Sequence, residues 1–140
     1  MAARAQTSRR SAGGNKMANG RKPAAKMDLN HLHLHVRNLD RAKRFYESYF
    51  CFRERVRHGD ILFLRNTSGF DLALAPDRTP VSFPEWFHFG FRLGSARAVR
   101  KLHSRMTSDG VQVHDIEEHA DYVTFRCMDS DGYGIEIYWE

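Results

Sequence analysis

Polar and apolar residues alternate with a period of two along residues 31–36, which read His-Leu-His-Leu-His-Val. In a β-strand, this period places the three histidines on one face and the aliphatic residues on the other. The alternation returns at residues 87–93, where His88, Gly90 and Arg92 are separated by aromatic or aliphatic residues. The pattern therefore predicts two strands, far apart in the chain, that each present histidine on a polar face.

A helical pattern follows each of these strands. Asn38 can cap a helix whose apolar positions recur every three or four residues as far as Phe50. Ser95 can cap a second helix, which ends at Asp109-Gly110. Shorter extended segments come next, at 52–58, 61–65 and 70–74 after the first helix and at 111–116, 122–127 and 134–139 after the second. The order strand, helix, strand, strand, strand thus occurs twice.

This repeat predicts an α+β fold of two tandem βαβββ modules. We place the first module at residues 27–76, a linker at 77–85 and the second module at 86–140, all within one domain. The apolar strand faces must pack on the two helices, because the chain offers no other element to cover them. The modules are therefore expected to form an open, cup-shaped mixed β-sheet with the helices on its outer face.

The same alternation predicts which side chains line the cup. Each module contributes histidine from its first strand and one carboxylate from its last strand. Two imidazoles and two carboxylates that converge in a cup suit a divalent metal ion such as Zn²⁺, Mn²⁺, Fe²⁺ or Ni²⁺. The residues sorted onto this surface are His31, His33, His35, Asp71, Ala73, His88, Gly90, Arg92, Glu136 and Tyr138.

The positive charge of the chain is confined to its N-terminal end. The net charge is +5, but residues 1–26 hold seven of the 22 Lys and Arg residues and none of the 17 acidic residues. Residues 27–140 therefore carry a net charge of −2, which argues against a nucleic-acid partner. Residues 1–26 also lack aromatic and branched aliphatic side chains, so we expect them to form a disordered basic tail.

Neither a membrane nor an oxidising compartment is expected. The sequence contains no run of about 18 apolar residues, the length that a membrane-spanning helix requires. Its two cysteines, Cys51 and Cys127, form no disulfide framework and fit a reducing cytoplasm. Both are expected to be buried as small apolar residues.

Three segments, in a fixed order, carry a family resemblance. They are residues 29–42, closing at Phe45-Tyr46, residues 87–91 and residues 129–136. They resemble, in turn, the first-module opening, the second-module opening and the closing turn and strand of the vicinal oxygen chelate superfamily. This superfamily includes glyoxalase I, fosfomycin-resistance transferases, extradiol dioxygenases and bleomycin-resistance proteins. The resemblance covers residues 28–140 and implies paired βαβββ modules around a metal.

The resemblance implies a metal-dependent enzyme that acts on a small-molecule substrate. It implies that His31, His88 and Glu136 are metal ligands and that Asp71 fills a fourth ligand position. In lyase or isomerase chemistry of this kind, Glu136 or Asp71 would take a proton from the carbon next to a substrate carbonyl. Other polar residues of the cup are expected to contact the substrate, namely His33, His35, Arg92 and Tyr138.

Two alternative functions stay open. An extradiol ring-cleaving dioxygenase would hold Fe²⁺ with two histidines and one carboxylate, and His33 or His35 could serve as its acid or base. A bleomycin-resistance-like protein would instead sequester a drug without metal, and Trp86 and Trp139 could stack on it. The four ligand-type residues favour the metal-dependent enzyme. Open sheet edges further predict a homodimer, with the metal held within one chain or across the dimer.

Overall fold

The structure of the protein is a computed structural model that describes residues 20, 22, 24–79 and 82–140. Its elements, in chain order, are β1 (His31–Val36), α1 (Leu39–Tyr49), β2 (Arg53–His58), β3 (Ile61–Arg65), β4 (Asp71–Pro76), β5 (Phe89–Arg92), α2 (Ala96–Ser108), β6 (Glu117–Glu118), β7 (Val123–Met128) and β8 (Gly134–Trp139). Most of the predicted basic tail lies outside the described residues, as do positions 80–81 of the predicted linker.

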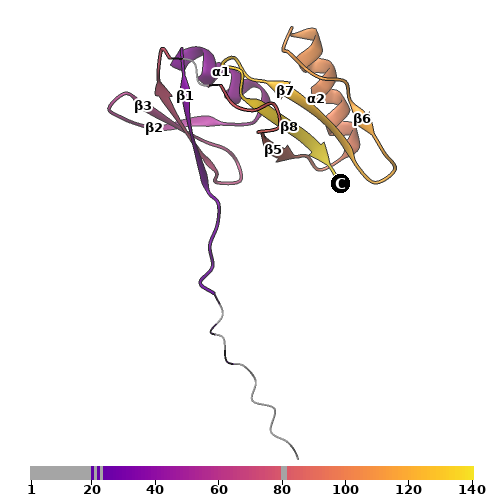
Figure 1. Ribbon diagram of the computed structural model, residues 1–140, viewed down its shortest axis with the longest axis horizontal. Coiled ribbons are helices and arrows are strands. Elements are labelled where there is room, and N and C mark those ends of the chain that lie inside the picture. The colour runs from indigo at the N-terminus through magenta and orange to yellow at the C-terminus, as the bar shows by residue number, and fades with distance from the viewer. Residues whose placement is uncertain (1–19, 21, 23, 80–81) are drawn as a thin grey trace, which may run out of the picture.

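The strands form two sheets of the same topology. Their strand orders are β1-β4-β3-β2 and β5-β8-β7-β6, with the first strand of each module parallel to its last and the other pairs antiparallel. Figure 1 shows the two sheets side by side, with α2 along the second sheet. The prediction of two tandem βαβββ modules is confirmed. Because each module begins with an edge strand, β1 and β5 both keep one side free of strand pairing within the described chain.

Both predicted helix caps are present. The side chain of Asn38 accepts a hydrogen bond from the amide of Arg41 at 2.8 Å, and that of Ser95 accepts one from the amide of Ala98 at 3.1 Å. Each cap satisfies an amide that has no partner within its helix. The apolar side of α1 enters the common core, where the ring of Phe50 stacks on Phe91 of β5 at 4.4 Å between centroids. The first helix therefore joins the two modules.

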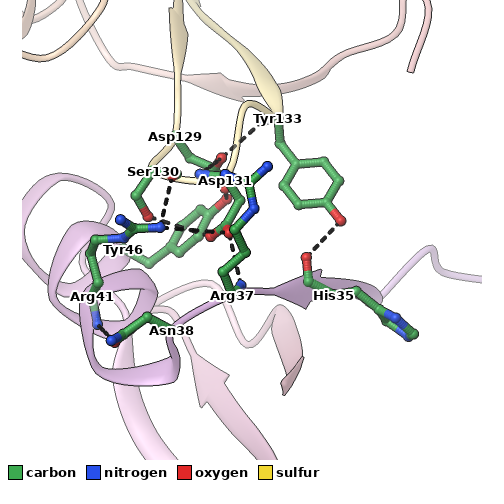
Figure 2. A network of polar contacts seen from close by, with 9 residues as sticks. All are labelled: His35, Arg37, Asn38, Arg41, Tyr46, Asp129, Ser130, Asp131 and Tyr133. Atoms are coloured by element: carbon green, nitrogen blue, oxygen red, sulfur yellow. Dashed lines mark hydrogen bonds and ion pairs between the residues drawn. The ribbon is translucent and has the colours of Figure 1, made fainter. Parts of the chain in front are cut away.

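Polar contacts also connect the two modules, as Figure 2 shows. The hydroxyl of Tyr46 on α1 donates to Asp129 at 2.6 Å, and both residues are buried. Asp129 begins the turn between β7 and β8, and its other carboxylate oxygen accepts the amides of Asp131 and Tyr133. The hydroxyl of Tyr133 in turn donates to the main-chain oxygen of His35 on β1 at 2.8 Å. These contacts fix the closing turn of the second module against the opening of the first.

Two predicted strands differ from the structure. The second-module opening was expected to be extended from residue 87, but β5 begins at Phe89, because a turn is closed by the bond from the amide of Phe87 to the oxygen of Pro84. Phe87 is 36% exposed and stacks on Phe83 instead of entering the core. Residues 111–116 run beside β7 but form only an isolated bridge, between Val113 and Cys127. On this side of β7, regular strand pairing is limited to β6.

The prediction that both cysteines are buried was wrong for Cys51. Cys127 on β7 is 1% exposed, whereas Cys51 is exposed and has a φ of 57° in the turn after α1. This left-handed conformation reverses the chain toward β2 and leaves the thiol in solvent.

Within the described chain, no helix is long and apolar enough to cross a membrane.

The two thiols should therefore differ in reactivity. Burial raises the pKa of Cys127 to about 12, so its reactive thiolate is scarce at neutral pH. Iodoacetamide applied to the folded protein at pH 8 is expected to modify Cys51 and to spare Cys127. Peptide mass spectrometry measures this, and the denatured protein, which should react at both positions, is the control. Equal modification of both thiols in the folded protein would contradict the buried position of Cys127.

Candidate metal centre

The second module brings His88 and Glu136 together. β5 and β8 are parallel neighbours in which Gly90 pairs with Glu136, and His88 lies two residues before Gly90. The Nε2 atom of His88 is 3.3 Å from Oε2 of Glu136. Gly134 makes this approach possible, since a Cβ atom there would lie 3.1 Å from the carbonyl oxygen of Phe87. The side chains of His88 and Glu136 are 27% and 31% exposed, so a ligand can reach both.

Two hydrogen bonds orient this pair. The Nδ1 atom of His88 is 2.9 Å from the main-chain oxygen of Trp86, which can only accept, so Nδ1 donates and Nε2 is the ring nitrogen that faces Glu136. The hydroxyl of Thr124 on β7 donates to Oε1 of Glu136 at 3.0 Å. Metal-binding histidines and carboxylates are commonly held by such outer partners. The second module thus brings Nε2 of His88 and Oε2 of Glu136 to the same point, 3.3 Å apart.

The first module presents His31 in the corresponding position. β1 and β4 are parallel neighbours, and His31 pairs with Asp71 in their register. The Nδ1 atom of His31 is 2.8 Å from the side-chain oxygen of Asn30. As in His88, an acceptor at Nδ1 leaves Nε2 free to bind a metal. Both histidines that the sequence indicated as ligands therefore have an oxygen acceptor beside Nδ1.

Asp71 is engaged by arginines. Both of its oxygens accept hydrogen bonds from Arg65, at 2.7 Å from Nε and 2.8 Å from Nη2. Arg55 contributes a further ion pair, with Nη2 at 3.4 Å from Oδ2. The hydrogen bonds from Arg65 lower the pKa of Asp71 below its usual value, and the positive charge of Arg55 adds to this effect. Direct metal binding by Asp71 stays a prediction, and it would require Arg65 to release at least one carboxylate oxygen.

A groove separates two half-sites, namely the pair His88 and Glu136 and the pair His31 and Asp71. It has a volume of about 620 Å³ and runs between β1 and β5, with His31 and His88 on its walls and Leu32, Phe70 and Phe89 among its apolar lining. Among the described residues, no three His, Cys, Asp or Glu side chains lie close enough to hold a metal ion together. The described chain thus assembles His88 with Glu136 and places His31 beside Asp71, without joining the two pairs.

The remaining predicted site residues lie on the expected faces. His33 and His35 are exposed on β1, and Nδ1 of His35 is 2.8 Å from a carboxylate oxygen of Asp77. Arg92 on β5 donates to the main-chain oxygen of Glu140 at 2.8 Å. Tyr138 is its register partner on β8. Arg92 and Tyr138 thus belong to the strands of the second module, and the two histidines belong to β1 of the first.

Sequence reasoning missed the residues that contact the predicted metal ligands. Thr124 and Asn30 orient Glu136 and His31, while Arg55 and Arg65 engage Asp71. The alternation of residues 61–65 would have placed Arg65 on the polar face, since Leu62 and Leu64 are buried. No comparable signal was available for Arg55, which lies at an irregularity in the pairing of β2 with β3.

Comparison with known proteins identifies the family of the chain. Residues 28–137 match the model of the family described as "Glyoxalase/Bleomycin resistance protein/Dioxygenase superfamily". No curated protein matches the sequence.

Several solved structures share the fold. A possible glyoxalase from Bacillus cereus is 32% identical, with a TM-score of 0.71 over 80% of this chain and 98% of that one. The fosfomycin resistance protein FosX from Listeria monocytogenes is 17% identical, with a TM-score of 0.73 over 83% of this chain and 95% of that one. Lactoylglutathione lyase from Agrobacterium tumefaciens is 17% identical, with a TM-score of 0.63 over 85% of this chain and 96% of that one.

Proposed function

Since the chain belongs to the glyoxalase/bleomycin resistance protein/dioxygenase superfamily, we propose that it is a divalent-metal-dependent enzyme acting on a small molecule with two neighbouring oxygens. The observation that carries the proposal is the state of the two histidines. An oxygen acceptor beside Nδ1 orients His31 and His88 alike, so that Nε2 is the ring nitrogen that would bind a metal in each. A histidine that merely fills a surface has no need of such a partner, whereas a metal ligand commonly has one.

We propose His31, His88 and Glu136 as the ligands, with Asp71 as the fourth candidate. When bound, the metal would act as a Lewis acid on the two substrate oxygens. Glu136 is the proposed proton acceptor, because Thr124 holds its Oε1 while Oε2 faces His88. Its carboxylate would take a proton from the carbon next to a substrate carbonyl, which is lyase or isomerase chemistry. Asp71 could do so only if it were released from Arg65.

We further propose that two chains complete the site as a homodimer. The described residues of one chain leave β1 and β5 as open edges on either side of an apolar groove. Unpaired edges and apolar grooves are commonly covered by a second copy of the chain. In this arrangement, His31 of one chain would meet His88 and Glu136 of the other. Two half-sites per chain would then give two metal sites per dimer.

Elemental mass spectrometry on the full chain, purified anaerobically without a histidine tag, tests the metal. About one divalent ion per chain is expected. Zn²⁺, Ni²⁺ or Mn²⁺ would support the proton-transfer chemistry, whereas Fe²⁺ would favour ring cleavage of a catechol by the same residues. Absence of metal, with no shift in Tm when these four ions are added, would overturn the enzyme and leave a drug-binding cup.

A further inference from the structure

We propose that Arg55 and Arg65 form an anion-binding site that holds a carboxylate or phosphoryl group of the substrate beside His31. This inference names the substrate class of the proposed enzyme and rests on that function. It begins from the side chains that surround Asp71, since His31 and Asp71 are direct neighbours across β1 and β4. Whatever binds the two arginines therefore lies next to a proposed metal ligand.

Arg65 is positioned but not saturated. Its Nε and one Nη2 hydrogen bind the two oxygens of Asp71. A guanidinium has five N–H donors, so three donors of Arg65 stay available. The side chain is 47% exposed, which leaves these donors open to solvent and to ligands. Asp71 thus fixes the plane of this guanidinium while its remaining donors stay accessible.

A bulge brings Arg55 to the same place. In the pairing of β2 with β3, Glu54 lies opposite Leu64 and Val56 lies opposite Phe63, so Arg55 is an extra residue without a partner. Such a bulge redirects a side chain and is common next to functional sites. It allows Arg55 to reach Asp71 at 3.4 Å, and its side chain is 42% exposed. Two guanidiniums therefore converge on one carboxylate, which leaves one positive charge uncompensated.

The charged side chains are distributed unevenly between the two faces of the first sheet. The strands of this sheet contain two carboxylates, Glu54 and Asp71. Glu54 lies on the helix side, where it pairs with Lys43 of α1 at 2.7 Å and with Arg57 at 3.1 Å. The cup side keeps Asp71 as its single strand carboxylate against both arginines. An anion that approaches the cup therefore meets a positively charged face, and paired guanidiniums bind carboxylate and phosphoryl oxygens well.

Calorimetric titration of the full, chelator-treated chain with inorganic phosphate and with acetate tests the site at low ionic strength. Arg55→Ala and Arg65→Ala are each expected to weaken the better-bound anion by at least about tenfold. Arg57→Ala is the matched control, because Arg57 has the same charge as Arg55 and lies on the same strand, β2, but on its helix side. It should change affinity by less than about twofold. Tighter binding of phosphate would identify a phosphoryl group, and tighter binding of acetate would identify a carboxylate.

Unchanged affinity in Arg55→Ala and Arg65→Ala, or an equal loss in Arg57→Ala, would overturn the anion site. Arg65→Lys, which keeps the charge and loses the paired donors, should also bind more weakly if the guanidinium geometry matters. The same preparations are titrated with Mn²⁺ to separate this inference from the proposed enzyme. Anion binding that depends on Arg55 in a chain that takes up no metal would refute the enzyme alone. Metal uptake with anion binding independent of both arginines would refute the anion site alone.

Discussion

Full chains carrying His31→Ala or Glu136→Ala are each expected to lose metal affinity by at least about 100-fold, since even an outer partner of a ligand contributes about 10–100-fold. Mixed and refolded together, the two variants are expected to recover about a quarter of the metal sites of the natural protein. The recovery follows from the division of the ligands between modules. Half of the randomly formed dimers contain one chain of each kind, and each such dimer has one complete site.

A second mixture is the control for this result. His88→Ala and Glu136→Ala both alter the second module, whose two proposed ligands lie 3.3 Å apart in one chain. No pairing of these variants can produce a complete site, so their mixture should take up no metal. Metal uptake is measured by elemental analysis after gel filtration of the refolded dimers. If the first mixture recovers no more metal than the second, the site belongs to a single chain and the cross-dimer arrangement is wrong.

Tyr46→Phe is expected to lower the free energy of unfolding by about 1–3 kcal/mol, the range for leaving a buried polar group without its partner. The change removes one oxygen and leaves the ring in place. Asp129 then loses its donor at 2.6 Å while it stays buried at 7% exposure. Because Tyr46 belongs to the first module and Asp129 to the second, the loss should weaken the connection between the two modules. Urea unfolding followed by circular dichroism measures it.

Tyr49→Phe is the matched control for this prediction. Tyr49 lies one turn further along α1, and its hydroxyl donates to an exposed carboxylate, that of Asp109, at 2.8 Å. Water can replace this partner, so the expected change is within about 0.5 kcal/mol. Equal changes in the free energy of unfolding for the two substitutions would contradict the prediction that burial makes the contact with Asp129 more important for stability.

Much of the fold could be predicted because its signals are local. The alternation of residues 31–36 and 134–139 matches β1 and β8 residue for residue. Asn38 and Ser95 mark the starts of both helices through hydrogen bonds that span three residues. Interactions of such short range depend only on residues that are close together in the sequence. Prediction was wrong at Phe87, where a turn closed by the bond to Pro84 interrupts the alternation and the ring stacks on Phe83 outside the core.

The division between sequence and structure is sharpest at the site. The amino-acid pattern alone was enough to place His31 and Glu136 on polar strand faces, because the strand period sets the face of a side chain. The partners of the site residues follow from how the strands assemble in three dimensions. The register of β5 on β8 brings His88 to Glu136, and a bulge in β2 brings Arg55 to Asp71. Register and bulges depend on how separate strands meet, and a period of two within one strand contains no information about its neighbour.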